Sequence, residues 1–400
     1  MPLAADFAPL AAPAPGDWLR LGQVCGLHQG SDGEIRPCPV DFDSPERLAP
    51  RRDRAIAAIS ACLPIALRRA PLHSAAMLLP TTMPAITYPA PGGDFEDVTL
   101  PAPAMPEGDD LVIAVRAIAI NPLDLKQHAG PPRLLGVDAA GEVVALGPAV
   151  QGFALGDHVC CAAPPNRPGS YGGFVTVDSR LVGRVPSGMG FAAAAALPCA
   201  GLTAWEALFE RLRIDDQSSL LVLGGAGGVG SMAVQLARLQ TQAVVTATAS
   251  RPESQAWLRR LGAHHLLDHA APLAPQAREK NLRFSHILAT QSTEAQWEAL
   301  CAMLAPRGTI CAIDMPGMLD MTKLRPKGGG FVFEALFAKA LARAPDMASQ
   351  GQALSAMAAH QGLQPIISMH GGRISAVNIT TCHAALASGR MLGKAVLEGW

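Results

Sequence analysis

A short glycine-rich run has the residue types and the spacing needed to bind phosphate groups. Gly225, Gly227 and Gly230 fit the pattern G-x-G-x-x-G, which alone is a weak signal. Here an apolar strand candidate, 220–223, precedes the pattern, and an amphipathic helix candidate, 229–239, follows it. Glycines allow the backbone to turn sharply and approach a pyrophosphate, and the start of the helix offers free N–H groups to it. The run therefore predicts a dinucleotide-binding turn.

A second clue to the ligand lies at the end of the next strand candidate, 244–248. Sites that prefer NAD usually place Asp or Glu there, because a carboxylate accepts a hydrogen bond from the ribose 2′-hydroxyl. This chain has Ser250 and Arg251 instead. A hydroxyl and a guanidinium suit a 2′-phosphate. The sequence therefore predicts NADPH (NADP) as the cofactor, with an ordinary solvated Ser-Arg turn as the alternative.

From about residue 190, helix and strand candidates alternate along the chain. The segments 191–197 and 202–211 are helix candidates that precede the glycine-rich run. Such alternation is typical of a parallel sheet covered by helices on both faces. We therefore predict an α/β fold with a Rossmann doubly wound parallel sheet. Its strand candidates are 220–223, 244–248, 265–267, 286–289 and 309–313, and further helix candidates are 229–239 and 253–261.

The part of the chain from Met83 to about residue 190 has a different pattern. An apolar strand candidate at 111–120 is followed by short β-rich segments between glycines, among them Gly147 and Gly156. This pattern is typical of a twisted, barrel-like sheet with tight turns. After the alternating part, a last strand candidate lies at 393–397.

Composition excludes several classes of partner. The formal net charge of −1 leaves no concentrated basic surface for nucleic acid or for a membrane. Residues 1–76 are rich in proline and lack the periodicity of a packed domain, so we predict a poorly ordered extension. They also lack the features of a signal peptide or a membrane span. The 9 cysteines follow no repeated spacing, which favours reduced thiols in a cytoplasmic protein.

Three further motifs stand in a fixed order before the glycine-rich run. They are Asn121-Pro-Leu-Asp124, Gly136-Val-Asp-Ala-Ala-Gly141, and Ala194-Ala-Ala-Leu-Pro198 with Gly201-Leu-Thr-Ala-Trp205. The series resembles the medium-chain dehydrogenase/reductase superfamily, and in particular its zinc-independent quinone oxidoreductase branch, over about residues 83–400. The resemblance implies a β-rich GroES-like catalytic domain over 77–199, a Rossmann NADP-binding domain over 200–340, and a segment over 341–400 that returns to the catalytic domain.

The resemblance also implies that zinc is absent. Zinc enzymes of the superfamily bind catalytic zinc through a Cys, a His-Glu pair, and a further Cys or His. Here the first Cys position falls within Asn121-Pro-Leu-Asp124, and the His-Glu pair reads Val137-Asp138, of which valine has no donor atom. Their structural zinc needs four closely spaced cysteines, whereas only Cys160-Cys161 stands here, a poor start for a tetrahedral site.

Roles for individual residues follow from the same resemblance. Asn121 and Thr203 would contact the nicotinamide side of the cofactor. The remaining cofactor-binding positions are Gly225, Gly227, Gly228, Val229 and Gly230 around the pyrophosphate, and Ser250, Arg251 and His269 around the adenosine phosphate.

Catalysis without zinc needs another donor for the charge that develops on the acceptor oxygen. The candidates are Lys126, the Asn121 amide, the Tyr171 hydroxyl and ordered water, and the sequence does not distinguish them. Lys126 stands where many relatives have a tyrosine. It either polarises a carbonyl group or is an ordinary surface lysine.

Together these features predict an NADPH-dependent oxidoreductase that transfers hydride to a quinone or a similar small electrophilic carbonyl compound. Two alternatives stay open: a reductase of α,β-unsaturated ketones or aldehydes, and a non-catalytic NADPH-binding sensor. Relatives commonly form a homodimer through a strand near 327–331. The consecutive glycines Gly328–Gly330 weaken strand order there, so the homodimer is a weaker expectation than the fold.

Overall fold

The computed structural model describes residues 27–29, 35–37 and 79–400. The chain divides into two units, Met1–His73 and Ser74–Trp400. In the first unit, β1 and β2, which are the two short described segments, pair antiparallel. The predicted N-terminal extension otherwise lies outside the described residues. Across the part of the chain that is described, no helix is long and apolar enough to cross a membrane.

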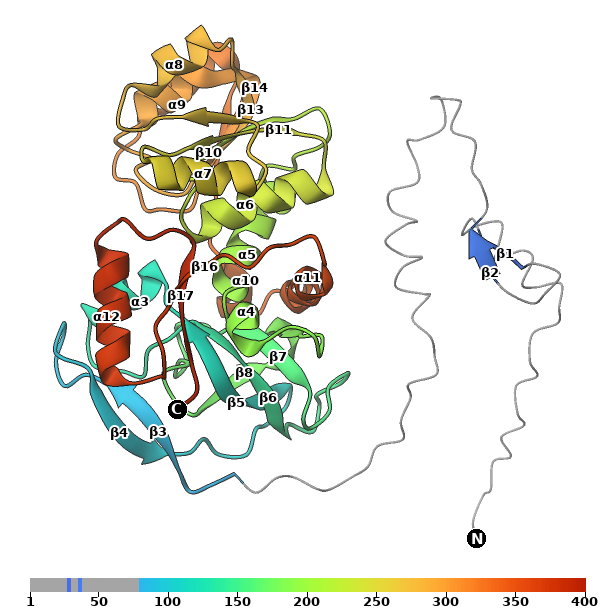
Figure 1. The fold of residues 1–400 in the computed structure, drawn as a ribbon, viewed down its shortest axis with the longest axis vertical. Coiled ribbons are helices and arrows are strands. Elements are labelled where there is room, and N and C mark those ends of the chain that lie inside the picture. Colours follow the sequence, from blue (N-terminus) through green and yellow to red (C-terminus); the bar gives the residue numbers. More distant parts are fainter. Residues whose placement is uncertain (1–26, 30–34, 38–78) are drawn as a thin grey trace. The chain divides into compact units, whose positions relative to one another are not determined.

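A six-stranded sheet occupies the middle of the chain (Figure 1). Its strand order is β12-β11-β10-β13-β14-β15, and every neighbouring pair is parallel. The order runs outward in both directions from the first strand, which is the doubly wound arrangement, so the predicted fold class is confirmed. The strands are β10 (Ser219–Leu223), β11 (Val244–Thr248), β12 (His265–Leu267), β13 (Phe284–Ala289), β14 (Leu304–Ala312) and β15 (Gly330–Phe333).

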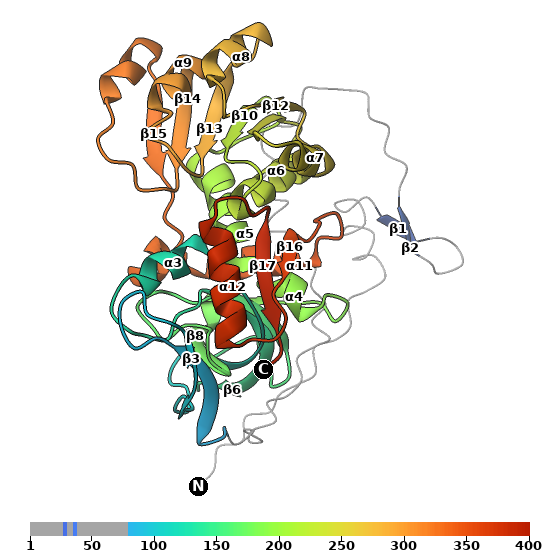
Figure 2. The same ribbon diagram turned by 60° about the vertical axis from the view of Figure 1, so that its left-hand side comes forward.

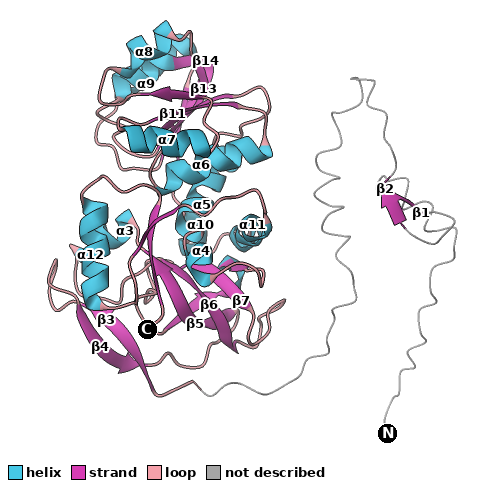
Figure 3. Cartoon of the chain, viewed as in Figure 1, coloured by secondary structure: helices cyan, strands magenta, loops and turns pink. Residues whose placement is uncertain are grey.

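Helices cover both faces of this sheet (Figures 1 and 3). Successive side chains of a strand point to opposite faces, and the central strand β10 is apolar throughout. Leu220 and Val222 belong to one buried cluster, whereas Leu221 and Leu223 belong to another. The first cluster contains residues of α6 (Gly228–Gln240) and α7 (Pro252–Arg260), and the second contains residues of α8 (Leu273–Glu279) and α9 (Trp297–Met303).

A second, mostly antiparallel sheet forms the β-rich part of the unit (Figure 2). Its order is β16-β17-β5-β6-β7-β9, with β8 paired to β5, so the last strand of the chain lies between an early strand and a late one. A separate hairpin joins β3 to β4. The bounds are β3 (Thr82–Thr87), β4 (Glu96–Pro101), β5 (Asp110–Ala119), β6 (Asp138–Leu146), β7 (His158–Ala162), β8 (Phe174–Asp178), β9 (Val182–Arg184), β16 (Ile367–His370) and β17 (Lys394–Glu398).

The remaining helices differ in places from the predicted ones. The helix expected over 202–211 is the end of α5 followed by a turn of π-helix, η3, and the helix expected over 191–197 ends at Ala195 because α5 starts anew at Pro198. These elements are α3 (Pro122–His128), η2 (Ser179–Leu181), α4 (Phe191–Ala195), α5 (Pro198–Trp205), η3 (Glu206–Arg211), η4 (Met321–Lys327), α10 (Ala338–Leu341), α11 (Ala348–Ala359) and α12 (Ala376–Ala387).

The glycines that were expected to weaken a strand lie just before and at the start of β15. This strand nevertheless pairs with β14 along its whole length, at the edge of the sheet. Lys327 fixes the approach to it, because its ammonium group donates to the carbonyl groups of Cys301, Ala302 and Leu304 at 2.6–2.8 Å. Phe333 of the edge strand is 53% exposed. The homodimer stays a prediction, with β15 as the edge available for pairing.

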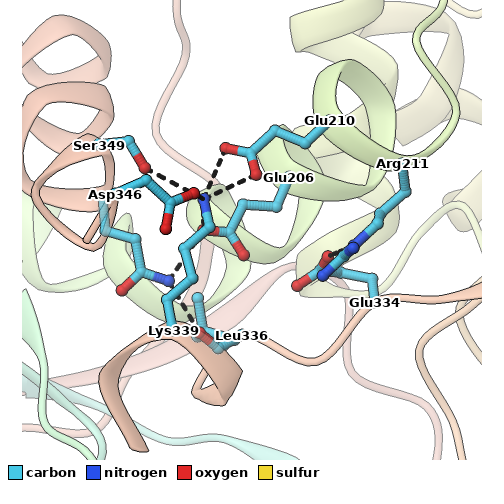
Figure 4. A network of polar contacts seen from close by, with 9 residues as sticks. Glu206, Glu210, Arg211, Glu334, Leu336, Lys339, Asp346 and Ser349 are labelled. Carbon is cyan, nitrogen blue, oxygen red and sulfur yellow. Dashed lines mark hydrogen bonds and ion pairs between the residues drawn. The ribbon is translucent and has the colours of Figure 1, made fainter. Parts of the chain in front are cut away.

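A polar network joins the two places where the chain passes between the sheets (Figure 4). Lys339, in α10, donates to Glu210 at 2.7 and 2.9 Å and lies 3.2 Å from Glu206, both in η3. Beside this group, Arg211 of η3 binds Glu334, which follows β15, at 3.0 Å. These polar contacts hold η3 against the segment from Glu334 to α10. Two of the carboxyl groups in the network, those of Glu206 and Glu334, are buried.

The Glu334 carboxyl group has an unusual proton affinity. Burial and the neighbouring Glu206 carboxyl group together raise its pKa to about 8, although the Arg211 guanidinium opposes the rise. One oxygen of Glu334 accepts from Arg211, whereas the other has no protein partner among the described residues. A proton on that second oxygen relieves the repulsion between the two carboxylates.

We predict that this proton makes stability depend on pH. A carboxyl group whose folded pKa is raised stabilises the fold below its ordinary pKa, and that contribution is lost as pH rises through the folded pKa. Between pH 6 and pH 9 the free energy of unfolding should fall by roughly 1–3 kcal/mol, measured by urea denaturation. Glu334→Gln, which keeps the shape without a titrating proton, should flatten that fall.

The control is Glu279→Gln, an exposed carboxylate at the end of α8. It should leave the pH dependence of the unfolding free energy as in the wild type. An unchanged slope in Glu334→Gln would show that Glu334 is ionised throughout this range.

Candidate functional site

A cavity of about 510 Å³ opens at the carboxyl ends of β10 and β11. This is the edge of a doubly wound sheet at which ligands usually bind. Residues of the glycine-rich turn line one side of it, and residues that follow β11 and β12 line another. The complete lining is Gly224, Ala226, Gly227, Thr248, Ala249, Ser250, Arg251, Ser254, His269, Gln291, Gly389, Arg390 and Met391.

The glycines of the turn are needed for different structural reasons. Gly224 has φ +74°, a conformation that other residues rarely adopt, and a Cβ there would lie 2.5 Å from the Thr290 hydroxyl. A Cβ on Gly230 would lie 2.4 Å from the Gly224 carbonyl oxygen, so this glycine lets α6 begin against the turn. Gly225 faces Ala247 of β11 and serves packing, whereas Gly227 lines the cavity with open space before it.

The far end of this cavity carries positive charge and no carboxylate. Ser250, Arg251 and His269, which were predicted to surround the adenosine phosphate, all line it, and Arg390 joins them from the C-terminal part of the chain. Arg251 donates to the Arg390 carbonyl oxygen at 2.7 Å and contacts Glu253 at 3.4 Å. Burial lowers the pKa of His269, so its ring is neutral near pH 7 and its Nδ1 contacts the Thr248 hydroxyl at 3.1 Å.

A second cavity, of about 430 Å³, continues from the first toward the β-rich part of the unit. The two cavities share Gly224, Gly227, Gln291, Gly389 and Met391, so together they form one elongated cleft. Such a cleft suits a dinucleotide, with the glycine-rich turn at its middle. The other lining residues of the second cavity are Ile120, Asn121, Pro122, Leu125, Lys126, Cys199, Ala200, Gly228, Val229, Gly230, Thr290, Ile313, Leu386, Gly393 and Lys394.

Charged and amide groups form the floor of the second cavity. The Lys394 ammonium group donates to the Asp138 carboxylate at 2.9 Å and to the Asn121 amide oxygen. The Asn121 amide nitrogen donates to the same Asp138 oxygen at 2.9 Å, and the Cys199 backbone N–H donates to the other oxygen at 2.7 Å. The side chains of Lys394 and Asp138 are 4% and 0% exposed, so this is a buried ion pair, and Asn121 and the Cys199 backbone supply further hydrogen bonds to it.

The segment between α12 and β17, residues 389–394, brings part of this floor into place, and we call it the C-terminal strap. Gly393 donates to the Ala226 carbonyl oxygen in the glycine-rich turn at 2.9 Å, and Lys394 donates through its backbone to Ile366 at 2.8 Å. Gly393 has φ +49°, and a Cβ there would lie 2.0 Å from the Ile366 oxygen. The strap therefore ties the end of the β-rich sheet to the nucleotide turn (Figure 1).

Asn121 is held in place from several directions. It caps α3, where its backbone N–H donates to Asp124 at 2.7 Å. Burial raises the pKa of Asp124 to about 7, although the Asn121 N–H and the Lys394 ammonium group lower it. The Asn121 amide nitrogen already donates to Asp138 and to Ala119. Its amide is consequently engaged with the protein, which argues against the predicted role as a free donor to the acceptor oxygen.

The other predicted residues of the nicotinamide end have separate places. Lys126 lines the second cavity and is exposed, and it makes no ion pair or side-chain hydrogen bond with the residues that the structure describes. Thr203 is buried in α5, where its hydroxyl donates to the Cys199 carbonyl at 2.7 Å, and it lines neither cavity.

Tyr171 lies in the core of the β-rich part, and the geometry does not support its predicted role as a donor to the acceptor. Its side chain is fully buried, and its hydroxyl contacts His383 Nε2 at 2.9 Å. Burial raises the pKa of Tyr171 well above its ordinary value and lowers the pKa of His383 to about 4. The pair is neutral near pH 7 and lines neither cavity.

The donor groups near this floor do not fit a zinc ion. Val137 offers no ligand atom, and both Asp138 oxygens are occupied by N–H groups. Cys160 and Cys161 are neighbours in β7, so their thiols point to opposite faces of the strand and belong to different buried clusters. In the described part of the chain, no group of three or more His, Cys, Asp and Glu side chains is placed to hold a metal ion.

Sequence reasoning missed Lys394 and Arg390 and gave Asp138 no role of its own. A usable signal was present for Lys394, because it is a charged residue that directly precedes three apolar residues, 395–397, of the final strand. Charged residues at such positions are rarely buried without a partner.

Comparison with known proteins agrees with this geometry. The family model for the alcohol dehydrogenase GroES-like domain matches residues 107–204, and the model for zinc-binding dehydrogenases matches residues 228–331. A zinc-type alcohol dehydrogenase-like protein of Staphylococcus aureus is 34% identical over 308 residues, which are 73% of this chain and 92% of that protein.

Solved structures agree as well. A candidate zinc-dependent alcohol dehydrogenase from Rhizobium etli is 38% identical, with a TM-score of 0.76, and the match covers 80% of this chain and 98% of that one. The quinone oxidoreductase from Coxiella burnetii is 24% identical, with a TM-score of 0.66 over 80% of this chain and 100% of its own, and shows the shared fold alone.

The chain belongs to the medium-chain dehydrogenase/reductase superfamily, as predicted. It is therefore an oxidoreductase of that superfamily, and its elongated cleft with a glycine cradle fits a nicotinamide dinucleotide. The narrower assignment to the quinone oxidoreductase branch stays a prediction.

We predict that two glycines of the turn respond differently to the same substitution. Gly230→Ala forces a methyl group against the Gly224 carbonyl and should cost about 1–3 kcal/mol in the free energy of unfolding. Gly227→Ala meets no atom closer than 3.7 Å at φ −72°, so its melting temperature should match the wild type. Its methyl group faces the cavity, so the affinity for a dinucleotide should nevertheless fall. Thermal melts and nucleotide titrations on both variants test this, and unchanged nucleotide affinity in Gly227→Ala would remove the turn from the binding site.

Proposed function

We propose that the protein is an NADPH-dependent oxidoreductase that transfers hydride to a quinone or a similar small electrophilic carbonyl compound without zinc. The observation that carries the NADPH part is the charge at the adenosine end of the cleft. Arg251 and Arg390 line that end, together with Ser250, and no carboxylate is among the lining residues. A site that prefers NAD would need an acceptor for the ribose 2′-hydroxyl there.

This proposal predicts a phosphate-dependent effect of Arg251. Arg251→Ala should weaken NADPH binding about tenfold, because a charge-assisted contact to phosphate is worth roughly 1.5–3 kcal/mol and solvent screens part of it. NADH lacks the 2′-phosphate, so its affinity should change little. Binding titrations of both nucleotides on the wild type and the variant measure this.

The matched control is Arg259→Ala, which removes an exposed arginine near the C-terminal end of α7, the helix that Arg251 caps. It should leave both affinities unchanged. Equal wild-type affinities for NADPH and NADH would contradict the proposed preference, and an equal loss of both in Arg251→Ala would mean that Arg251 only supports the strap through Arg390.

The cofactor, when bound, supplies the hydride, and the protein provides the surroundings. The glycine-rich turn and the start of α6 offer backbone N–H groups to the pyrophosphate. Ile120, Leu125, Ile313 and Leu386 give the second cavity apolar walls that limit the access of water to the reacting atoms. With a quinone as acceptor, solvent can protonate the reduced product, so the chain needs no strong general acid.

Lys126 is the residue best placed among the predicted donors to face an acceptor. It lines the second cavity, is exposed, and is not held by an ion pair or hydrogen bond in the described structure. Its ammonium group would stabilise negative charge that develops on a carbonyl oxygen. Asn121 is engaged with Asp138 and Lys394, which leaves Lys126 as the donor at this end that other protein groups do not hold.

Two other functions use the same cleft: reduction of α,β-unsaturated ketones or aldehydes, and NADPH binding without catalysis. An NADPH oxidation assay with a quinone panel and an enone panel separates all three. We expect turnover with quinones, together with far less than one zinc ion per chain in a metal analysis. Faster turnover of enones would select the first alternative, and NADPH binding without any turnover would select the second.

A zinc content near one per chain, whose removal abolishes turnover, would contradict the zinc-free mechanism. Comparison of the chelator-treated and untreated protein in the same assay makes that outcome distinguishable from a wrong acceptor class.

A further inference from the structure

The walls of the second cavity carry positive charge and no acidic group. Lys126 and Lys394 are its two charged lining residues, and no Asp or Glu of the described chain lines it. The charge of Lys394 is balanced by Asp138 at 2.9 Å. The charge of Lys126 is not balanced, because this side chain has no ion pair or hydrogen bond with the part of the chain that the structure describes. The cavity therefore favours an anionic occupant.

Helix α3 presents Lys126 to this cavity beside apolar residues. Pro122, Leu125 and Lys126 all line the cavity, and they occupy positions i, i+3 and i+4 of the helix, which share one face. Asp124 of the same helix is buried and does not line the cavity, and its carboxylate accepts a hydrogen bond from the Asn121 backbone. The helix thus offers an apolar surface and one cation to the cavity, while its acidic residue is engaged elsewhere.

Lys126 lies on the solvent side of the cavity. Asn121, at the floor, is buried, whereas Lys126 is exposed and lies more than one helical turn further along α3, roughly 7.5 Å at a rise of about 1.5 Å per residue. Beside α3 runs α12, whose Leu386 also lines the cavity (Figures 1 and 2). An acceptor whose reacting ring lies near the floor would consequently meet Lys126 with a substituent that extends toward solvent.

We propose that the acceptor is itself an anion: a quinone or a similar electrophilic carbonyl compound that carries a carboxylate, which pairs with Lys126. The apolar walls of the cavity suit its ring. An ammonium group has three N–H donors, so it can bind a carboxylate oxygen and still face a carbonyl oxygen. The carboxylate is unchanged by the reaction, because a quinone ring takes up the hydride of NADPH and one proton from solvent to give the hydroquinone. This inference rests on the proposed function and adds the charge of the acceptor to it.

The test compares two acceptors that share one ring and differ in charge: a naphthoquinone with a propionate side chain, and the amide of that acid. The wild type should have a lower KM for the acid. In Lys126→Met, kcat/KM for the acid relative to the amide should fall about three- to tenfold, since solvent screens part of the charge pair. Lys126→Arg keeps the charge and should keep most of the preference. A loss of kcat that both acceptors share concerns the carbonyl group, and the ratio removes it.

A binding measurement makes the result independent of turnover. With NADP⁺ in place of NADPH no reduction occurs, so calorimetric titrations of the acid and the amide, with and without the nucleotide, give their affinities directly. The advantage of the acid should fall by the same factor in Lys126→Met. The control for net charge is Lys280→Met, which removes an exposed lysine directly after α8 and should leave both affinities unchanged.

Three outcomes would overturn the inference. They are equal wild-type affinities for the acid and the amide, equal losses for both in Lys126→Met, and a loss of NADPH affinity in Lys126→Met as large as the loss for the acid, which would assign this lysine to the cofactor. The proposed function fails in a different way: the acid would then bind better than the amide through Lys126, yet neither compound nor any other acceptor would be reduced.

Discussion

The buried contact between Lys394 and Asp138 joins residues that are 256 positions apart and belong to β17 and β6 of the β-rich sheet. Taking both charges out of water is costly, and the hydrogen bonds from Asn121 and the Cys199 backbone offset part of that cost. These four groups lie where the second cavity meets the glycine-rich turn. The shape of the inner cleft therefore depends on this one charged cluster, and on the strap that delivers its cation.

Local features could be predicted from the sequence, because the residues that determine them are adjacent in the chain. The glycine-rich turn needs only its own glycines and the strand and helix beside it, and β11 has the predicted bounds of 244–248. The positions of Ser250 and Arg251 at one end of the first cavity could be predicted for the same reason, because both residues closely follow β11. At these positions the local conformational preference of the sequence agrees with the packing in the folded protein.

The cluster around Asp138 could not be predicted, because it assembles from distant segments. Lys394 and Asn121 are 273 positions apart, and no periodicity in either segment indicates that they meet. Tyr171 shows the converse error: a polar residue in a promising stretch turned inward to His383 in the core. The π-helical turn η3 was also missed, because the contacts of Glu206 with Lys339 and Gln350 that accompany it come from segments more than 100 residues later. A single sequence shows composition and spacing, whereas these features depend on contacts between residues that are far apart in the chain.

The hydrogen bond from Arg251 to the Arg390 carbonyl places one end of the strap at the first cavity, and Lys394 places its other end at the second. A ligand in the first cavity that restrains Arg251 would restrain the strap as well, so a ligand in the second cavity would lose less conformational entropy on binding. The two halves should consequently bind with positive cooperativity, and linkage requires that each half raises the affinity for the other by the same factor. The dinucleotide is then more than two fragments that share a cleft, because the segment between its subsites acts as a common element whose order both halves stabilise.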